Sequence, residues 1–171
     1  MIELSLDEIN NKAPYHVDSV EHHDGYFTFS TDFGVNYTVG FDVDDLIQSD
    51  ISYQFVLINI DNTKSPRDHK VRDTIRCIVE EFFAKNNNSL LYLCETGDRK
   101  QAMRNRLFEH WFSTYKFNSL YTFHSAVVDA EGIENYVAII MRIDNPNLTN
   151  VLMEFGTAIQ TLQNKPSESA R

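Results

Sequence analysis

The chain has 171 residues, which is enough for one domain and too few for two with separate cores. Apolar residues make up 42 % and charged residues 23 %, a globular composition that excludes disorder throughout. There is no apolar run of about 18 residues and no basic start, so neither a membrane helix nor a signal peptide is predicted. We expect a single domain over residues 1–164 and a disordered tail over 165–171, which lacks any periodic pattern.

The charge is unevenly distributed. Residues 1–50 hold eleven acidic residues and one basic residue, Lys12, which accounts for the whole net charge of −10. Such asymmetry is typical of an interaction surface, or of acidic turns that keep strand edges solvated. The two cysteines, Cys77 and Cys94, lie in apolar segments, which indicates buried thiols in a reducing compartment and predicts a cytoplasmic protein.

The first third predicts a short helix and a hairpin. Ser5 to Glu8 has the spacing of a capping box, so a helix is expected before Pro14. Tyr26–Thr31 and Val35–Phe41 both alternate in polarity around a short loop that contains Gly34, which is typical of a β-hairpin. The apolar residues of the second strand are expected on one buried face.

The middle third predicts a strand, a helix, a second strand and a second helix. Tyr53–Ile60 is apolar without alternation around Phe55 to Ile58, as in a strand covered on both faces. Apolar residues then recur at helical spacing from Val71 to Phe83. Leu90–Cys94 is another short apolar run, and a helix is expected after it. This succession predicts a βαβ crossover with parallel strands.

The last third predicts a second hairpin, from Leu120–Val128 and Tyr136–Ile143, and a final helix capped by Asn147. Its apolar stripe comprises Leu148, Val151, Leu152, Phe155, Ile159 and Leu162. The fold class is therefore α+β (or α/β): a mixed sheet of about six strands with antiparallel hairpins at both ends, a central βαβ crossover and helices packed on the sheet.

The turn from Thr96 to Arg99 is a candidate anion site. It joins a buried strand to a helix start, where ligands commonly bind in open sheets and where unpaired N–H groups attract anions. Gly97 allows close approach to the backbone, and Arg99 offers a forked pair of donors. A phosphate-containing small molecule is the ligand class that these groups fit.

Basic residues begin both central helices and add to this candidate. Arg72 belongs to the first cluster, with Arg67, Lys70 and Arg76. Arg104 belongs to the second helix, where a helical wheel places it near the centre of a face formed by Leu107, Phe108, Trp111, Phe112 and Tyr115. Arg104 is thus either a buried ion pair or an anion-binding group. The other basic residues either bind an anion or simply pair with neighbouring acids at helical spacing.

The motifs of well-known sites are absent. The histidines and acidic clusters match no zinc or calcium pattern, and no nucleotide-binding glycine loop or nucleophile motif is present, so no metal and no cofactor are predicted. The order Cys-x-x-x-Asp-Arg-x-x-x-x-Arg-x-Arg-x-x-Phe-x-x-Trp-Phe, between Tyr92 and Phe112, resembles an uncharacterised bacterial family of unknown function. That resemblance implies no activity, ligand or catalytic residue.

Three function classes follow, and whether the protein is an enzyme stays open. The first is a small cytoplasmic binding or interaction protein, with a protein partner or a second copy, that uses a sheet edge or the acidic first hairpin. The second is an enzyme or sensor for an anionic small molecule at Thr96–Arg99. The third is weak nucleic-acid association through the two basic helix starts, which the acidic total disfavours. No membrane association is predicted.

Overall fold

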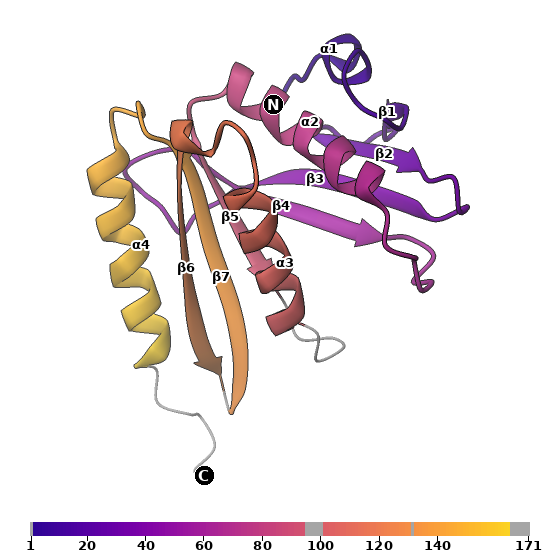
Figure 1. Ribbon diagram of the computed structural model, residues 1–171. Helices are drawn as coiled ribbons and strands as arrows, with labels where there is room; N and C mark the ends of the chain where they lie inside the picture. Colours follow the sequence, from indigo (N-terminus) through magenta and orange to yellow (C-terminus); the bar gives the residue numbers. More distant parts are fainter. Residues whose placement is uncertain (1, 95–100, 131, 165–171) are drawn as a thin grey trace. The chain divides into compact units, whose positions relative to one another are not determined.

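The computed structural model describes residues 2–94, 101–130 and 132–164. These residues form four α-helices, a short 3-10 helix and seven strands of one mixed sheet, in the order β1-β2-β3-β4-β5-β7-β6 (Figure 1). The predicted mixed α+β fold is therefore confirmed. The elements are α1 (Leu6–Asn10), β1 (Val17–Ser19), β2 (Tyr26–Ser30), β3 (Asn36–Asp44), β4 (Ser52–Asn59), α2 (His69–Lys85), β5 (Ser89–Cys94), α3 (Gln101–Ser113), η1 (Asn118–Leu120), β6 (Tyr121–Ala130), β7 (Ile133–Arg142) and α4 (Leu148–Gln163).

The chain divides into two compact units. Unit 1 consists of Met1–Asp42 and Phe55–Asn87, and unit 2 of Val43–Gln54 and Asn88–Arg171. No helix within the described ranges is long and apolar enough to cross a bilayer.

In unit 1 the predicted hairpin is present as β2 and β3, paired antiparallel from Tyr26↔Gly40 to Ser30↔Asn36. Ser5 caps α1, since its hydroxyl accepts a hydrogen bond from Glu8 N at 3.3 Å. Strand β1 was not predicted, because three residues are too few to show an alternating pattern. This strand pairs antiparallel with β2 and continues the hairpin by one strand.

The core of unit 1 is aromatic. Val39 and Phe41 of β3 are buried, as predicted, and the ring of Phe41 stacks on that of Phe82 from α2 with centroids 4.7 Å apart. Phe27 meets the edge of Phe41 from the neighbouring strand. The expectation that β4 is covered on both faces along its length was wrong for Ile58, which is 46 % exposed, because the covering of the second face stops short of the strand's carboxyl end.

In unit 2, β5, β7 and β6 form an antiparallel set, and the predicted second hairpin is present as β6 and β7. Helix α4 packs on one face of this set (Figure 1). The buried cluster between them comprises Ile47, Leu91, Val128, Val137, Ile139, Met141, Val151, Phe155 and Ile159. Asn147 does not cap α4 with its side chain; instead its N–H donates to Asn145 Oδ1 at 2.7 Å, so the Asn145 side chain organises the turn before the helix.

Helix α3 is present, and its predicted inward face differs from the observed one at Leu107 and Asn105. Leu107 is 43 % exposed, whereas Asn105 is buried. Three predicted residues contact rings of the sheet: Phe108 lies 4.2 Å from Tyr92, Phe112 stacks on Phe123 at 5.1 Å, and Tyr115 lies 6.3 Å from Tyr121, between ring centroids. A wheel drawn from apolar residues alone cannot include a buried asparagine, so the prediction missed Asn105 and wrongly included Leu107.

Candidate functional site

The predicted anion-binding residues are only partly within the described ranges. Thr96, Gly97 and Arg99 lie outside the described residues, so the candidate anion turn stays a prediction. Arg104 lies on α3 and is half-buried. Arg72 lies in the first turns of α2, where its Nε donates to Asp73 Oδ1 at 2.8 Å.

The basic start of α2 is largely paired with carboxylates of unit 1. Arg76 lies 3.6 Å from Asp73, and Lys70 Nζ donates to Asp32 Oδ2 at 2.6 Å. The hydrogen bond to Lys70 lowers the pKa of the Asp32 carboxyl, and the same contact raises the pKa of Lys70. The pair between Arg76 and Asp73 has the helical spacing that the sequence left as the alternative to anion binding, whereas Lys70 pairs with an acid from another element.

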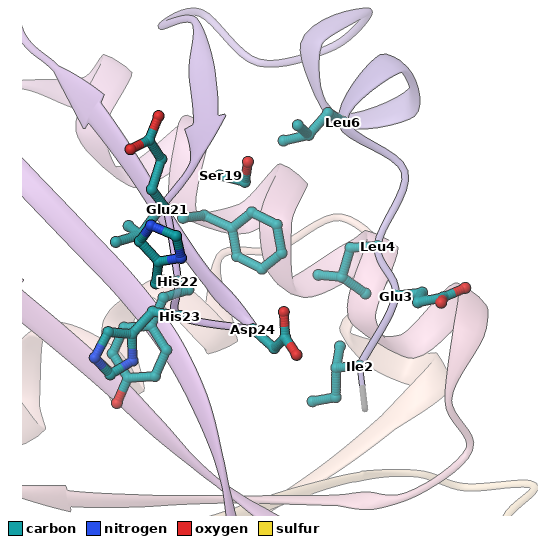
Figure 2. Close-up of a pocket in the computed structure, with 13 residues that line it drawn as sticks. Ile2, Glu3, Leu4, Leu6, Ser19, Glu21, His22, His23 and Asp24 are labelled. Carbon is teal, nitrogen blue, oxygen red and sulfur yellow. The ribbon is translucent and has the colours of Figure 1, made fainter.

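A hollow of about 540 Å³ lies in unit 1 between the N-terminal segment and the turn after β1. Figure 2 shows Ile2, Leu4 and Leu6 on one side, with His22 and His23 on the other. The hollow is lined by Ile2, Glu3, Leu4, Leu6, Ser19, Val20, Glu21, His22, His23, Asp24, Gly25, Tyr26 and Phe27. Within the described part of the chain no three His, Cys, Asp or Glu side chains gather to hold a metal ion. Apolar and polar side chains both line the hollow, so its lining is mixed and not predominantly apolar.

The most distinctive surface of unit 2 is the strand β6, which ends the strand order. It pairs with β7 without interruption from Tyr121↔Arg142 to Ala130↔Ile133, so no bulge interrupts the ladder. The direction of its backbone groups follows from two contacts. The carbonyl of Leu120 accepts from Ile143 N at 3.0 Å, on the β7 side, whereas the carbonyl of Val127 is reached from α4.

Even-numbered residues of β6 therefore direct their N–H and C=O groups to β7, and odd-numbered residues direct theirs away from the sheet, as antiparallel pairing requires. We call the outward backbone groups of Phe123, Ser125, Val127 and Asp129 the β6 edge. Within the described residues, one side chain of another element is hydrogen-bonded to the β6 edge: Gln163 Nε2 of α4 donates to Val127 O at 2.8 Å.

The side chains of β6 hold the strand firmly on both faces. Phe123 stacks on Phe112 of α3, and the Ser125 hydroxyl donates to Glu109 Oε1 at 2.8 Å. On the opposite face Val128 is buried against α4. The β6 edge is thus presented by a rigid, ten-residue strand that does not need a partner in order to be extended.

The devices that a strand's own sequence supplies to protect an edge are largely missing from β6, although Gln163 of α4 reaches one of its outward carbonyls. Proline, lysine, inward-pointing charges, bulges and short length all discourage strand addition. The sequence Tyr-Thr-Phe-His-Ser-Ala-Val-Val-Asp-Ala contains no proline, lysine or arginine, and Asp129 near its end is the only acidic residue. A long, regular and nearly uncharged edge is a template on which another strand can pair.

The neighbouring helix extends the uncharged surface. The ten residues of β6 and the sixteen of α4 include two acidic or basic side chains, Asp129 and Glu154, where the chain average of 23 % corresponds to about six. The Glu154 carboxylate is engaged by the N–H groups of Gln48 and Ser49, at 2.6 and 3.2 Å. We call the β6 edge together with the solvent-facing side of α4 the β6–α4 surface.

Sequence reasoning predicted β6 as a strand but did not single out its edge. The available signal was the composition: a ten-residue strand without proline or basic residues, next to a helix with one charge. What the sequence could not supply was the position of the strand, because strand order is a long-range property.

The fold and this surface define a mixed α+β protein with a long, charge-poor strand at one end of its sheet. The chain belongs to the family described as "Family of unknown function (DUF6169)", whose model matches residues 67–157, just over half of the chain. The matched segment runs from the residues before α2 into α4 and contains the whole of β6. The resemblance to an uncharacterised family that the sequence indicated is thereby confirmed.

No curated protein matches the chain. Among solved structures, the chain is similar to the N-terminal domain of a ribosomal-protein-alanine acetyltransferase from Clostridium acetobutylicum ATCC 824. The identity is 12 %, the TM-score is 0.44, and the match covers 80 % of this chain and 97 % of that one. A likeness at this level carries no inference about activity.

Proposed function

We propose that this protein is an interaction protein that binds a polypeptide by adding an extended strand to the β6 edge. The observation that carries the proposal is the uninterrupted, charge-poor strand at the end of the sheet, with the backbone groups of alternate residues directed outward. This choice corresponds to the first of the three function classes that the sequence suggested.

The chemistry of such binding is mainly that of the main chain. An added strand would exchange N–H···O=C bonds with Phe123, Ser125 and Val127, each contributing about 0.5–1.5 kcal/mol net. Side chains of the ligand would lie beside Phe123 and Val127 on one face and beside His124 and Ala126 on the other. Aromatic and β-branched residues are the ones that form favourable cross-strand pairs there.

The Gln163 side chain occupies one acceptor of the edge, the carbonyl of Val127. Because Gln163 is exposed and close to the end of α4, it can turn away at little cost when a strand arrives. In the unbound protein the same contact shields the edge from indiscriminate pairing.

The test is binding of synthetic nine-residue peptides to the full chain, followed by NMR of the β6 amides. One peptide of the panel has the sequence of residues 121–129, and the others vary in β-branched and aromatic content. The key variant is Val127→Pro, since it removes an outward N–H and leaves the β7 ladder intact. Val127→Thr, which keeps the N–H and the β-branched shape, is the matched control.

We expect a bound peptide to slow hydrogen exchange at Phe123, Ser125 and Val127, and its affinity to fall by about tenfold or more in Val127→Pro, with little change in Val127→Thr. Binding that is equally strong in both variants, or no peptide that alters these amides, would refute the proposal.

A further inference from the structure

A carboxylate lies beside the middle of the β6 edge. Glu109 of α3 is half-buried, and its Oε1 accepts hydrogen bonds from the Ser125 hydroxyl at 2.8 Å and from Asn105 Nδ2 at 3.1 Å. Ser125 is one of the residues whose backbone groups point outward, and its side chain lies on the face of the sheet that Glu109 covers. The carboxylate is therefore within reach of a side chain that an added strand places next to Ser125.

The negative charge of Glu109 is not neutralised by its neighbours. Both of its hydrogen-bond donors are uncharged, and both bonds are made to the same oxygen. Within the described residues, Glu109 forms no ion pair, and its Oε2 accepts no hydrogen bond. Water can solvate this half-buried group only as long as the β6 edge is open.

Asn105 indicates that the carboxylate is deliberately oriented. The Asn105 side chain is 6 % exposed, and its Oδ1 is buried without a hydrogen-bond partner among the described residues. A buried, unpaired acceptor is unfavourable and rare in folded proteins. A leucine of similar size would avoid that penalty. What the amide contributes is its Nδ2 bond, which together with the Ser125 hydroxyl fixes the direction of the Glu109 side chain.

The geometry of strand addition determines which ligand residue meets Glu109. In an antiparallel pair, the residue opposite Ser125 exchanges both backbone hydrogen bonds with it, and the two Cβ atoms lie about 5 Å apart on the same face. The ligand residues two positions away lie beside Phe123 and Val127, which are apolar. A lysine or arginine at the central position can direct its charged end to Glu109 while its aliphatic stem packs along those apolar side chains.

Electrostatics favour a basic residue at this position. A strand that covers the edge removes water from Glu109, so an apolar residue opposite Ser125 would leave the carboxylate desolvated and unpaired, and an acidic residue would repel it. A basic residue replaces the lost water by a charge-assisted hydrogen bond. The net charge of −10 acts in the same direction, because it attracts a cationic segment during its approach.

We propose that Glu109 is the specificity-determining residue of the β6 edge and selects an extended segment of another polypeptide with lysine or arginine opposite Ser125. Apolar residues stand two positions to either side of that basic residue. This inference rests on the proposed function, because it names the chemistry of the ligand of the same edge. Asn105 is a positioning residue, since it acts on the ligand through Glu109.

The experiment is calorimetric titration of the full chain with three nine-residue peptides that differ only in their central residue, which is lysine, methionine or glutamate. The other positions alternate valine and threonine in all three peptides. Slowed hydrogen exchange of the Phe123, Ser125 and Val127 amides verifies that a peptide lies on β6. Intermolecular nuclear Overhauser effects between its central residue and Ser125 establish the register.

The key variant is Glu109→Gln, because glutamine keeps an acceptor for both existing hydrogen bonds and removes only the charge. Glu134→Gln is the matched control. Glu134 is exposed on β7 and pairs with Asp129, which lies four residues from Ser125, or about 14 Å along the strand. That separation exceeds the screening length of about 8–10 Å. Asn105→Leu tests the positioning residue.

We expect the lysine peptide to bind the wild-type chain about tenfold or more tightly than the methionine peptide, and the glutamate peptide to bind most weakly. The ratio of the lysine and methionine affinities should fall to about one in Glu109→Gln and stay unchanged in Glu134→Gln. Asn105→Leu should reduce this ratio without lowering the melting temperature, because the unpaired acceptor is removed together with the amide.

Different results would overturn the inference and the proposed function. Peptides that protect the β6 amides without a preference for lysine, or with a preference that survives Glu109→Gln, overturn the inference and leave the proposed function standing. If no peptide protects those amides, both fail. A lower melting temperature of Asn105→Leu with the full lysine preference would show that Asn105 only supports the fold. The comparison of the three peptides on the wild-type chain decides the matter even if a variant does not fold.

Discussion

Gly40 of β3 lies directly beneath the ring of Tyr26 on β2, its cross-strand partner. A Cβ at this position would lie 2.5 Å from two ring carbons of Tyr26, which is too close for any real contact. The ring is anchored, since the Tyr26 hydroxyl donates to Asp42 Oδ2 at 2.8 Å. Gly40→Ala must therefore displace the ring and break or weaken this hydrogen bond.

The magnitude follows from the contacts that are lost. Displacing the ring removes a hydrogen bond worth about 1 kcal/mol and aromatic packing worth about 0.5–1.5 kcal/mol. Replacing glycine within a strand returns about 0.5–1 kcal/mol of chain entropy. We expect a net loss in the free energy of unfolding of about 1 kcal/mol. In a Tyr26→Ala background the ring is absent, so the same Gly40→Ala change becomes stabilising by about 0.5 kcal/mol.

The assay is a double-mutant cycle by urea denaturation, with the wild type, both single variants and the double variant. The decisive observation is the change of sign between the two backgrounds. An effect of Gly40→Ala that is equal in the presence and absence of the Tyr26 ring would show that the ring does not limit this position, and the steric reasoning would be wrong.

Three further predictions concern both units. Ile139 is fully buried on β7, so Ile139→Ala should lower the free energy of unfolding by about 3 kcal/mol, as measured by urea denaturation. A loss below about 1 kcal/mol would contradict the position of Ile139 in the core. The N–H group of Gln48 lowers the pKa of Glu154 below its ordinary 4.5. The ionised Glu154 side chain therefore stabilises the fold fully above pH 4.5, and this contribution is lost as pH falls through the lowered pKa. Glu154→Gln should flatten the acid limb of the curve of stability against pH, and an unchanged limb would contradict this. Burial, followed by the hydrogen bond to Asp42, raises the pKa of Tyr26 to about 12. The neutral Tyr26 hydroxyl therefore stabilises the fold below pH 10, and this contribution disappears towards pH 12. Ultraviolet titration should show this late ionisation, and Asp42→Asn should bring the pKa of Tyr26 closer to 10.

Most helices and strands of this chain can be predicted from short windows of sequence. Both hairpins were predictable because a glycine-containing turn between two strand-like runs acts over a few residues, with alternating polarity as a further signal in the first. Gly34 and Gly132 do adopt the positive φ that such turns need. The helices α2 and α4 were predictable from a 3.6-residue apolar repeat. Element type depends on neighbours in the chain, and that information is present in any short window.

Which residues share a surface depends on contacts between elements that are distant in the chain. Asn105 is buried and Leu107 exposed on α3 because the sheet, rather than the helix's own pattern, sets which side faces inward. Gly40 is explained only by the ring that lies across it from another strand. The candidate site also depends on tertiary structure. The sequence predicts β6 as a strand, but the position of β6 at the end of the sheet depends on pairings between residues far apart in the sequence. Those pairings are selected by the packing of the whole core, which no local pattern encodes.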